Sequence, residues 1–372
     1  MSRRVRKKRR VSIKKVTIFS VTLIFILVIL LNLSNIRNYF ISKVTGYKFD
    51  TVAVFFENDI YKDIKDNDYS QTLESIINTE YYNDKYVKEY INIQYIDDKM
   101  FLSNVSKLLD KGYDSEDING IFNELDGDDI LFLIDNDYFK DIIKLLSVEY
   151  FRNDYFSRYI NYFNSNEYDI DTAVVNVNIG LDNDYYTNVS DIDDQESLLV
   201  LVNKYNKLSN DYVPDDLKSL NAKYGNGKMR AVAADAFEKM CIDAKESGIK
   251  LYGGSGYRSY SYQANLYDRY VRTDGKKAAD TFSARAGYSE HQTGLAMDVM
   301  NGRWEYIDKS DKEYEWLIEN SYKYGFILRY LEGKEEITGY IYEPWHYRYV
   351  GVEVATEIIK LGITYDEYVA KK

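Results

Sequence analysis

An uncharged run of 18 residues, Val16 to Leu33, constrains the fold of this 372-residue chain more than any other feature. The run is rich in Val, Ile, Leu and Phe, and a helix of this length extends about 27 Å, near the ~30 Å hydrocarbon thickness of a membrane. Residues 1–15 carry nine Lys and Arg and no acidic residue. Since basic flanks stay in the cytoplasm, the sequence predicts a basic cytoplasmic arm at 1–15, a transmembrane signal-anchor helix at 16–33 and an extracellular remainder.

A cleaved signal peptide is the competing interpretation of this N-terminus. The apolar core of a signal peptide usually has about 7–15 residues and is followed by a small-residue A-x-A cleavage site. The run here is longer, and residues 32–36 read Asn-Leu-Ser-Asn-Ile. The pattern therefore favours an uncleaved anchor.

Composition excludes several classes of protein. Beyond residue 15 the chain has 39 basic and 60 acidic residues, a net charge of −21, whereas a nucleic-acid-binding protein needs a basic surface. The single cysteine, Cys241, rules out an internal disulfide and a cysteine zinc finger. Its helix-spaced apolar neighbours predict that this thiol is buried in a core.

Residues 48–168 are predicted to form an all-α repeat region, because they lack proline and carry Ile, Leu, Tyr and Phe at helical spacing. Segments 80–92 and 149–161 align without gaps, and 107–119 is a looser copy. Such repetition is typical of stacked helix-turn-helix units. The favoured function is a spacer that holds the next domain off the membrane, and a peptide- or glycan-binding array is the alternative. The acidic run 126–129 lacks calcium-loop spacing and predicts helix caps.

Residues 170–370 mix strand-like and helical patterns, which predicts a separate α+β domain. Alternating or β-rich segments predict strands at 173–180, 198–205 and 250–252, and helical spacing predicts helices at 231–247 and 352–361.

The chain has two histidines, and both lie in motifs that contain a carboxylate. His291 and Asp298 are too far apart to share an ion easily on one helix, but Gly294 allows a bend and Leu295–Val299 alternates as a strand. A loop histidine and a strand aspartate can then converge.

The second motif is Tyr340-Ile-Tyr-Glu-Pro-Trp-His346. Pro344 disfavours helix at Glu343, so we expect a strand that enters a tight turn, with Glu343 and His346 serving one site. Two histidines and a carboxylate, with a fourth position for water, bind catalytic zinc, and a further glutamate can act as general base. The alternative is a histidine–carboxylate pair that stabilises an inert fold.

Four segments together are similar to the VanY-type D-alanyl-D-alanine carboxypeptidases, zinc peptidases of the fold group shared with lysostaphin and hedgehog. They are Ser255–Tyr260 with Gln263, Ser283–Asp298, Tyr324–Ile327 and Glu343–His346. The most specific is the Ser-x-His-x-x-Gly-x-Ala-x-Asp motif. The resemblance covers about residues 170–370 and does not include the helical repeats. Ala286 stands where relatives commonly have proline.

The resemblance implies a role for each of eight residues. His291, Asp298 and His346 would bind Zn²⁺, and Glu343 would be the catalytic base. Arg258, Gln263, Ser283 and Ser289 would line the substrate pocket. Arg258 would also take part in catalysis, either by binding the terminal carboxylate or by stabilising the developing oxyanion.

The implied function is zinc-dependent removal of the C-terminal D-Ala from peptidoglycan stem peptides outside the cell. Two alternatives stay open. An L,D-carboxypeptidase acting on tetrapeptide stems shares these motifs, and a wall-binding or sensing module would rely on the helical repeats instead. Expected partners are stem peptides and, through residues 16–33, the membrane.

Overall fold

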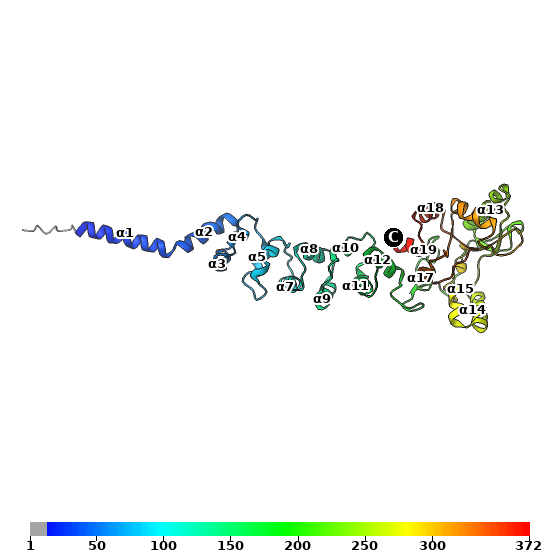
Figure 1. Ribbon diagram of the computed structural model, residues 1–372, viewed down its shortest axis with the longest axis horizontal. Coiled ribbons are helices and arrows are strands. Elements are labelled where there is room, and N and C mark those ends of the chain that lie inside the picture. Colours follow the sequence, from blue (N-terminus) through cyan, green and yellow to red (C-terminus); the bar gives the residue numbers. More distant parts are fainter. Residues whose placement is uncertain (1–12) are drawn as a thin grey trace, which may run out of the picture. The chain divides into compact units, whose positions relative to one another are not determined.

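A computed structural model describes residues 13–372 of the chain, which divide into two compact units (Figure 1). Unit 1 ends at Leu146 and unit 2 begins at Ser147. The sequence placed this boundary later, between 168 and 170. The helices after Leu146 group with unit 2 because they pack on the C-terminus: the Asn178 side-chain amide donates to the Ala370 carbonyl at 3.0 Å, and Lys371 pairs with Asp171 at 3.1 Å.

The described part of unit 1 is helical, as the sequence predicts for this region. Its elements are α1 (Ile13–Leu31), α2 (Leu33–Thr45), α3 (Phe49–Glu57), α4 (Tyr61–Ile64), α5 (Gln71–Ile76), η1 (Asp84–Tyr86), α6 (Val87–Asn92), α7 (Phe101–Lys111), α8 (Ser115–Glu124), α9 (Gly127–Asp135) and α10 (Ile142–Leu146). The acidic run at 126–129 does start a helix, since the Asp126 side chain accepts from the backbone N–H groups of Asp128 and Asp129.

The expected membrane helix is divided into α1 and α2. The break lies at Asn32, whose side-chain amide donates back to the Val28 carbonyl at 2.8 Å and competes with the helical ladder. Among the described residues, no single helix is long and apolar enough to cross a membrane. The pair Ser20–Leu31 and Leu33–Thr45, bent by 54°, meets those criteria of length and composition together. Residues 1–12 of the basic arm lie outside the described residues.

The internal repeat detected in the sequence is also present in the structure. Both aligned copies form a single 3-10 turn followed by a helix, η1 with α6 and η2 with α11. In the first copy the Asn83 backbone N–H donates to the Tyr90 hydroxyl at 3.3 Å, and in the second the Arg152 N–H donates to the Tyr159 hydroxyl at 3.2 Å. The same tyrosine therefore anchors the same turn in each copy.

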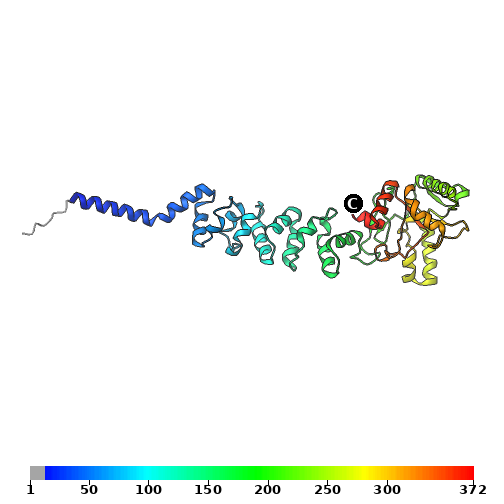
Figure 2. The same cartoon turned by 45° about the horizontal axis from the view of Figure 1, so that its top comes forward.

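Unit 2 contains short strands among helices, and Figure 2 shows α14 and α15 side by side (yellow). Its elements are η2 (Asn153–Tyr155), α11 (Phe156–Ser165), α12 (Ile170–Ile179), β1 (Ser190–Asp191), β2 (Asn206–Lys207), β3 (Leu217–Ser219), η3 (Ala222–Tyr224), β4 (Lys228–Arg230), α13 (Ala231–Glu246), β5 (Tyr252–Ser255), α14 (Tyr260–Asp274), α15 (Lys276–Phe282), η4 (Glu290–Thr293), β6 (Ala296–Met300), α16 (Lys312–Asn320), η5 (Ser321–Tyr324), β7 (Phe326–Leu328), α17 (Glu335–Thr338), β8 (His346–Tyr349), α18 (Val352–Leu361) and α19 (Tyr365–Ala370).

An antiparallel sheet in the order β5-β6-β8-β7 forms the centre of unit 2. Helix α13 packs its buried face, which includes Phe237 and Cys241, into one hydrophobic core with Met297 and Val299 of β6. The α+β fold, the helix at 231–247, the helix at 352–361 and the buried thiol are thus confirmed. The strand predicted at 250–252 is displaced and begins at Tyr252.

Two predicted strands are wrong. Of the predicted strand 173–180, residues 173–179 lie in α12, which the Asp169 side chain caps and which Gly180 follows with a φ of 104°. Most residues of this helix are buried, so its apolar positions show no amphipathic helical period. Residues 198–205 follow an irregular path, because side chains rather than a neighbouring strand hydrogen-bond to their backbone carbonyls. Arg348 donates to the Leu198 and Val200 oxygens at 3.1 and 2.8 Å.

Candidate active site

Two adjacent strands bring the second histidine motif to the first. Asp298 on β6 pairs directly with His346 on β8 in the antiparallel register. His291 lies on η4, and Gly294 ends that turn with a φ of 67°, in the left-handed region that glycine adopts readily. The chain can then enter β6 at Ala296. His346 begins β8 immediately after a turn at Pro344 and Trp345, so the strand follows this turn, whereas the sequence placed it before the turn.

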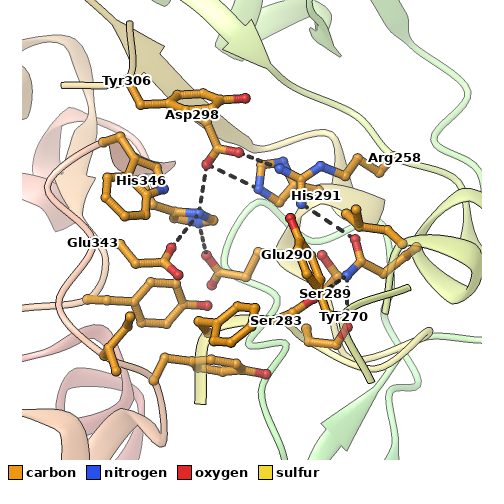
Figure 3. Close-up of a pocket in the computed structure, with 18 residues that line it drawn as sticks. Arg258, Tyr270, Ser283, Ser289, Glu290, His291, Asp298, Tyr306, Glu343 and His346 are labelled. Atoms are coloured by element: carbon orange, nitrogen blue, oxygen red, sulfur yellow. Dashed lines mark hydrogen bonds and ion pairs between the residues drawn. The ribbon is translucent and has the colours of Figure 1, made fainter. Parts of the chain in front are cut away.

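His291, Asp298 and His346 are buried, and one ligand atom from each lies within 4.8 Å of the others (Figure 3). Asp298 Oδ1 lies 3.4 Å from His291 Nε2 and 3.1 Å from His346 Nδ1. This oxygen is buried and accepts no well-aligned hydrogen bond from any described residue. An acceptor oxygen facing two imidazole nitrogens, with no proton donor aimed at it, is suited to a cation among the three atoms.

The donor types fit zinc. Two imidazoles and a carboxylate leave a fourth tetrahedral position for water. His291 Nδ1 lies 2.7 Å from the Gly256 carbonyl, which orients the ring so that Nε2 faces Asp298. Burial lowers the pKa of His346, but its interactions with the carboxylates of Asp298 and Glu290 outweigh burial and raise that pKa to about 9. The site therefore favours positive charge, which a divalent cation would supply.

Glu343 lies beside this cluster, with Oε2 3.6 Å from His346 Nδ1. Its side chain is buried, and its backbone N–H donates to the Tyr330 carbonyl at 3.3 Å. Burial raises the pKa of Glu343 to about 7; His346 opposes this rise and Asp298 adds to it. A carboxyl group with a near-neutral pKa can both accept and donate a proton at physiological pH.

The start of α14 positions two further predicted residues. Ser259 caps this helix, with Arg258 just before it and Gln263 in its first turn. Arg258 Nε donates to Ser255 Oγ at 2.8 Å, and its Nη2 pairs with Asp298 Oδ2. Gln263 is buried and donates to the Ala284 carbonyl at 2.8 Å. The Arg258 guanidinium is therefore held with its positive charge next to Asp298 Oδ2, the oxygen that does not face the histidines.

All eight residues singled out in the sequence line one cavity of about 480 Å³. They are Arg258, Gln263, Ser283, Ser289, His291, Asp298, Glu343 and His346. Aromatic and aliphatic side chains complete the wall: Leu266, Tyr270, Phe282, Tyr306, Tyr330, Tyr340, Ile341 and Trp345. The cavity is large enough for a short peptide end, and its lining combines polar and apolar side chains.

Glu290 is a residue of this site that the sequence analysis missed. It lines the same cavity, is buried, and its Oε2 lies 3.4 Å from His346 Nε2. An acidic residue directly before His291 was the available signal, but its partners Arg329 and Arg348 are 39 and 58 residues away along the chain. No local pattern brings those residues together.

A buried metal-binding triad beside a carboxyl group that can transfer protons is typical of the active site of a metal-dependent hydrolase. Comparison with known proteins narrows this class. A family model described as VanY, D-alanyl-D-alanine carboxypeptidase, matches residues 226–352. YodJ of Bacillus subtilis, provisionally assigned as a carboxypeptidase, is 39% identical over 213 residues, covering 53% of this chain and 78% of that protein.

A D-alanyl-D-alanine carboxypeptidase of Enterococcus faecalis is 38% identical over 187 residues, covering 47% of this chain and 67% of the relative. Among solved structures, the L,D-carboxypeptidase LdcB matches with 39% identity and a TM-score of 0.46, over 50% of this chain and 91% of LdcB. A vancomycin resistance D,D-pentapeptidase VanY in complex with Zn(II) matches with 36% identity and a TM-score of 0.42, over 46% of this chain and 98% of that one.

This chain belongs to the VanY family of D-alanyl-D-alanine carboxypeptidases. It is a peptidase by family, and the donor types of its His291, Asp298 and His346 fit zinc.

Proposed function

We propose that this chain is an outward-facing, membrane-anchored enzyme that hydrolyses the C-terminal D-Ala from peptidoglycan stem peptides. One observation carries the proposal: a metal-binding triad, a near-neutral carboxyl group and an arginine face a single cavity. Relatives named as D-alanyl-D-alanine carboxypeptidases give the substrate class.

The metal site and Glu343 divide the chemistry between them. His291, Asp298 and His346 would hold zinc, which would lower the pKa of water at the site and polarise the scissile carbonyl. Ionised Glu343 accepts a proton from the attacking water and then donates this proton to the amine of the departing D-Ala.

Arg258 supplies the positive charge that a carboxypeptidase needs. A guanidinium can either bind the free terminal carboxylate or stabilise the developing oxyanion, and both roles need this charge in the cavity. Gln263, Ser283 and Ser289 place amide and hydroxyl groups on the same cavity wall, where they hydrogen-bond the peptide end. Hydrogen bonds to Ser255 and Asp298 hold the arginine in one orientation before substrate arrives.

The N-terminus supports the membrane part of the proposal. Residues 16–33 act as an uncleaved anchor, the basic arm at 1–15 stays in the cytoplasm, and residues 34–372 lie outside the cell. Large apolar side chains of α1 are exposed, including Leu27 at 55% and Leu31 at 72%, as lipid-facing residues would be. The helices at 48–168 serve as a spacer between the membrane and the catalytic domain.

Mass spectrometry of defined stem peptides tests the catalytic proposal. The full chain in detergent is incubated with pentapeptide and with tetrapeptide, in zinc and in excess chelator. We expect the pentapeptide to lose one alanine in zinc and to stay intact in chelator. Loss of D-Ala from the tetrapeptide alone would identify an L,D-carboxypeptidase with the same site. No cleavage of either peptide by a zinc-loaded chain would favour a wall-binding module instead.

A further inference from the structure

Glu290 is a buried carboxylate beside the zinc site that the catalytic steps above do not use. One of its oxygens, Oε1, accepts from Arg329 Nε at 2.8 Å and from Arg348 Nη1 at 2.9 Å. The other oxygen, Oε2, lies 3.4 Å from His346 Nε2. The carboxylate therefore bridges two arginines and the ring of a zinc ligand.

The arginines are as deeply buried as the carboxylate. Arg329 and Arg348 are 1% and 0% exposed, and Glu290 is 2% exposed. Burying unpaired charges is costly, but Arg329 also pairs with the buried Asp366 at 2.6 Å. Two acidic and two basic side chains give this group no net charge. It can act on His346 without adding net charge to a site that already holds Asp298 and Glu343.

Hydrogen bonds from surrounding backbone and side chains fix these four residues. Arg348 donates to the carbonyl oxygens of Leu198 and Val200, at 3.1 and 2.8 Å. Asp366 accepts from the Asn203 side-chain amide at 2.9 Å. A fully hydrogen-bonded buried network is rigid, so Oε2 of Glu290 is held at one position relative to β8.

The position of that oxygen determines which nitrogen of His346 can bind metal. If Nε2–H donates to Glu290, then Nδ1 keeps its lone pair, and Nδ1 is the atom 3.1 Å from Asp298 Oδ1. His291 has the opposite arrangement, because its Nδ1 contacts the Gly256 carbonyl and its Nε2 faces Asp298. A carboxylate partner also makes a zinc-bound imidazole more basic than a carbonyl partner does.

We propose that Glu290 is a positioning residue that holds His346 with Nδ1 toward zinc, and that Asp366 of α19 maintains Glu290 through Arg329. This inference rests on the zinc site of the proposed function. Asp366 lies in α19, beyond residues 226–352, the range that the family model matches. A helix near the end of the domain would thus influence metal binding indirectly, through Arg329 and Glu290.

Nitrogen NMR of the zinc-loaded full chain in detergent, with ¹⁵N-labelled histidine, tests the proposal directly. The chain has two histidines, so the spectrum contains two imidazole systems, which through-bond correlations to the histidine backbone amides assign without altering a zinc ligand. We expect His346 to be protonated at Nε2 and His291 at Nδ1. Ligation of His346 through Nε2 would overturn the proposal, because Glu290 could then accept no proton from it. This spectrum requires no Glu290 variant.

Zinc affinity supplies the second test. Glu290→Gln keeps the shape and removes the charge, and we expect its zinc dissociation constant to rise about 10–100-fold, measured by competition with a chromophoric chelator. Asp366→Asn, remote from His346, should give a smaller rise in the same direction. Unchanged zinc affinity in Glu290→Gln, with a lowered unfolding temperature, would assign Glu290 a structural role and overturn the proposal. Both tests omit substrate, so a failure of peptide hydrolysis leaves them unaffected.

Discussion

His291 and His346 present different ring nitrogens to Asp298, and each ring has its own orienting partner. A backbone carbonyl holds His291, and the Glu290 carboxylate faces His346. Around them, the two remaining acids, Glu290 and Glu343, are both buried but differ in their charged partners. Arginines and His346 outweigh burial and lower the pKa of Glu290, whereas burial raises that of Glu343 to about 7. One carboxyl group stays ionised and the other can exchange a proton.

The raised pKa of Glu343 predicts a pH-dependent stability of the zinc-free chain. Its pKa rises from 4.5 to about 7 on folding, so ionising Glu343 costs folding free energy on the order of 3 kcal/mol. The stabilisation from this proton is complete below pH 4.5 and is lost as pH rises through about 7. Glu343→Gln mimics the protonated acid. We therefore expect the variant's unfolding temperature, relative to the native chain, to increase between pH 5 and pH 8.

Zinc provides the control for that measurement. A bound cation favours the ionised carboxylate, so saturating zinc should shrink the difference between the two chains at pH 8. A difference that is the same at pH 5 and pH 8 without zinc would contradict the raised pKa.

At the scale of elements, short strands and tight turns place the site more than long helices do. Asp298 and His346 face each other because β6 and β8 pair in one register. The turn after β5 passes close to β4, and there Gly256 orients His291 through its carbonyl. A Cβ on Gly256 would lie 2.2 Å from the Lys228 carbonyl oxygen, which is closer than packing allows.

Gly256→Ala should therefore weaken zinc binding as well as stability. The added methyl must push β4 and the turn apart, and overpacking of this kind costs roughly 1–3 kcal/mol. Metal titration and thermal unfolding measure the two effects. Gly302→Ala is the matched control, because its Cβ would meet Lys250 at an ordinary 3.4 Å. Native zinc affinity in Gly256→Ala would show that this turn does not orient His291.

Elements with a clear local pattern were predictable from the sequence. Helices α13 and α18 have helical apolar spacing, and β6 alternates after a glycine bend. Helix α12 was mistaken for a strand because it is buried on most sides and rich in Val. The eight site residues could be singled out because each lies in a short motif of the sequence. The Glu290 network could not be predicted, because its pairs join residues 37 to 58 positions apart.

At the scale of the whole molecule, the N-terminal run and the acidic remainder predict how the chain is placed in a cell. Leu23→Asp with Leu27→Asp puts two charges in the centre of the run, at about 2.5–3.5 kcal/mol each in a membrane. We expect the native chain to stay in the membrane fraction after an alkaline carbonate wash, and the double variant to be released.

Val213→Asp is the matched control, because this side chain is 52% exposed and lies outside both helices of the candidate span. It should remain in the membrane fraction like the native chain. Protease added to cells without their wall should digest both units. Full protection of the chain from that protease would contradict an outward-facing enzyme.

The account depends most on Glu343 acting together with bound zinc. The most direct measurement is D-Ala release from pentapeptide by the native chain and by Glu343→Gln, both first shown to hold equal zinc. We predict that the variant keeps its metal and loses about 10²–10⁴-fold in turnover, the usual contribution of general acid–base catalysis. A zinc-loaded Glu343→Gln chain that releases D-Ala at the native rate would contradict the assignment of Glu343 as the base.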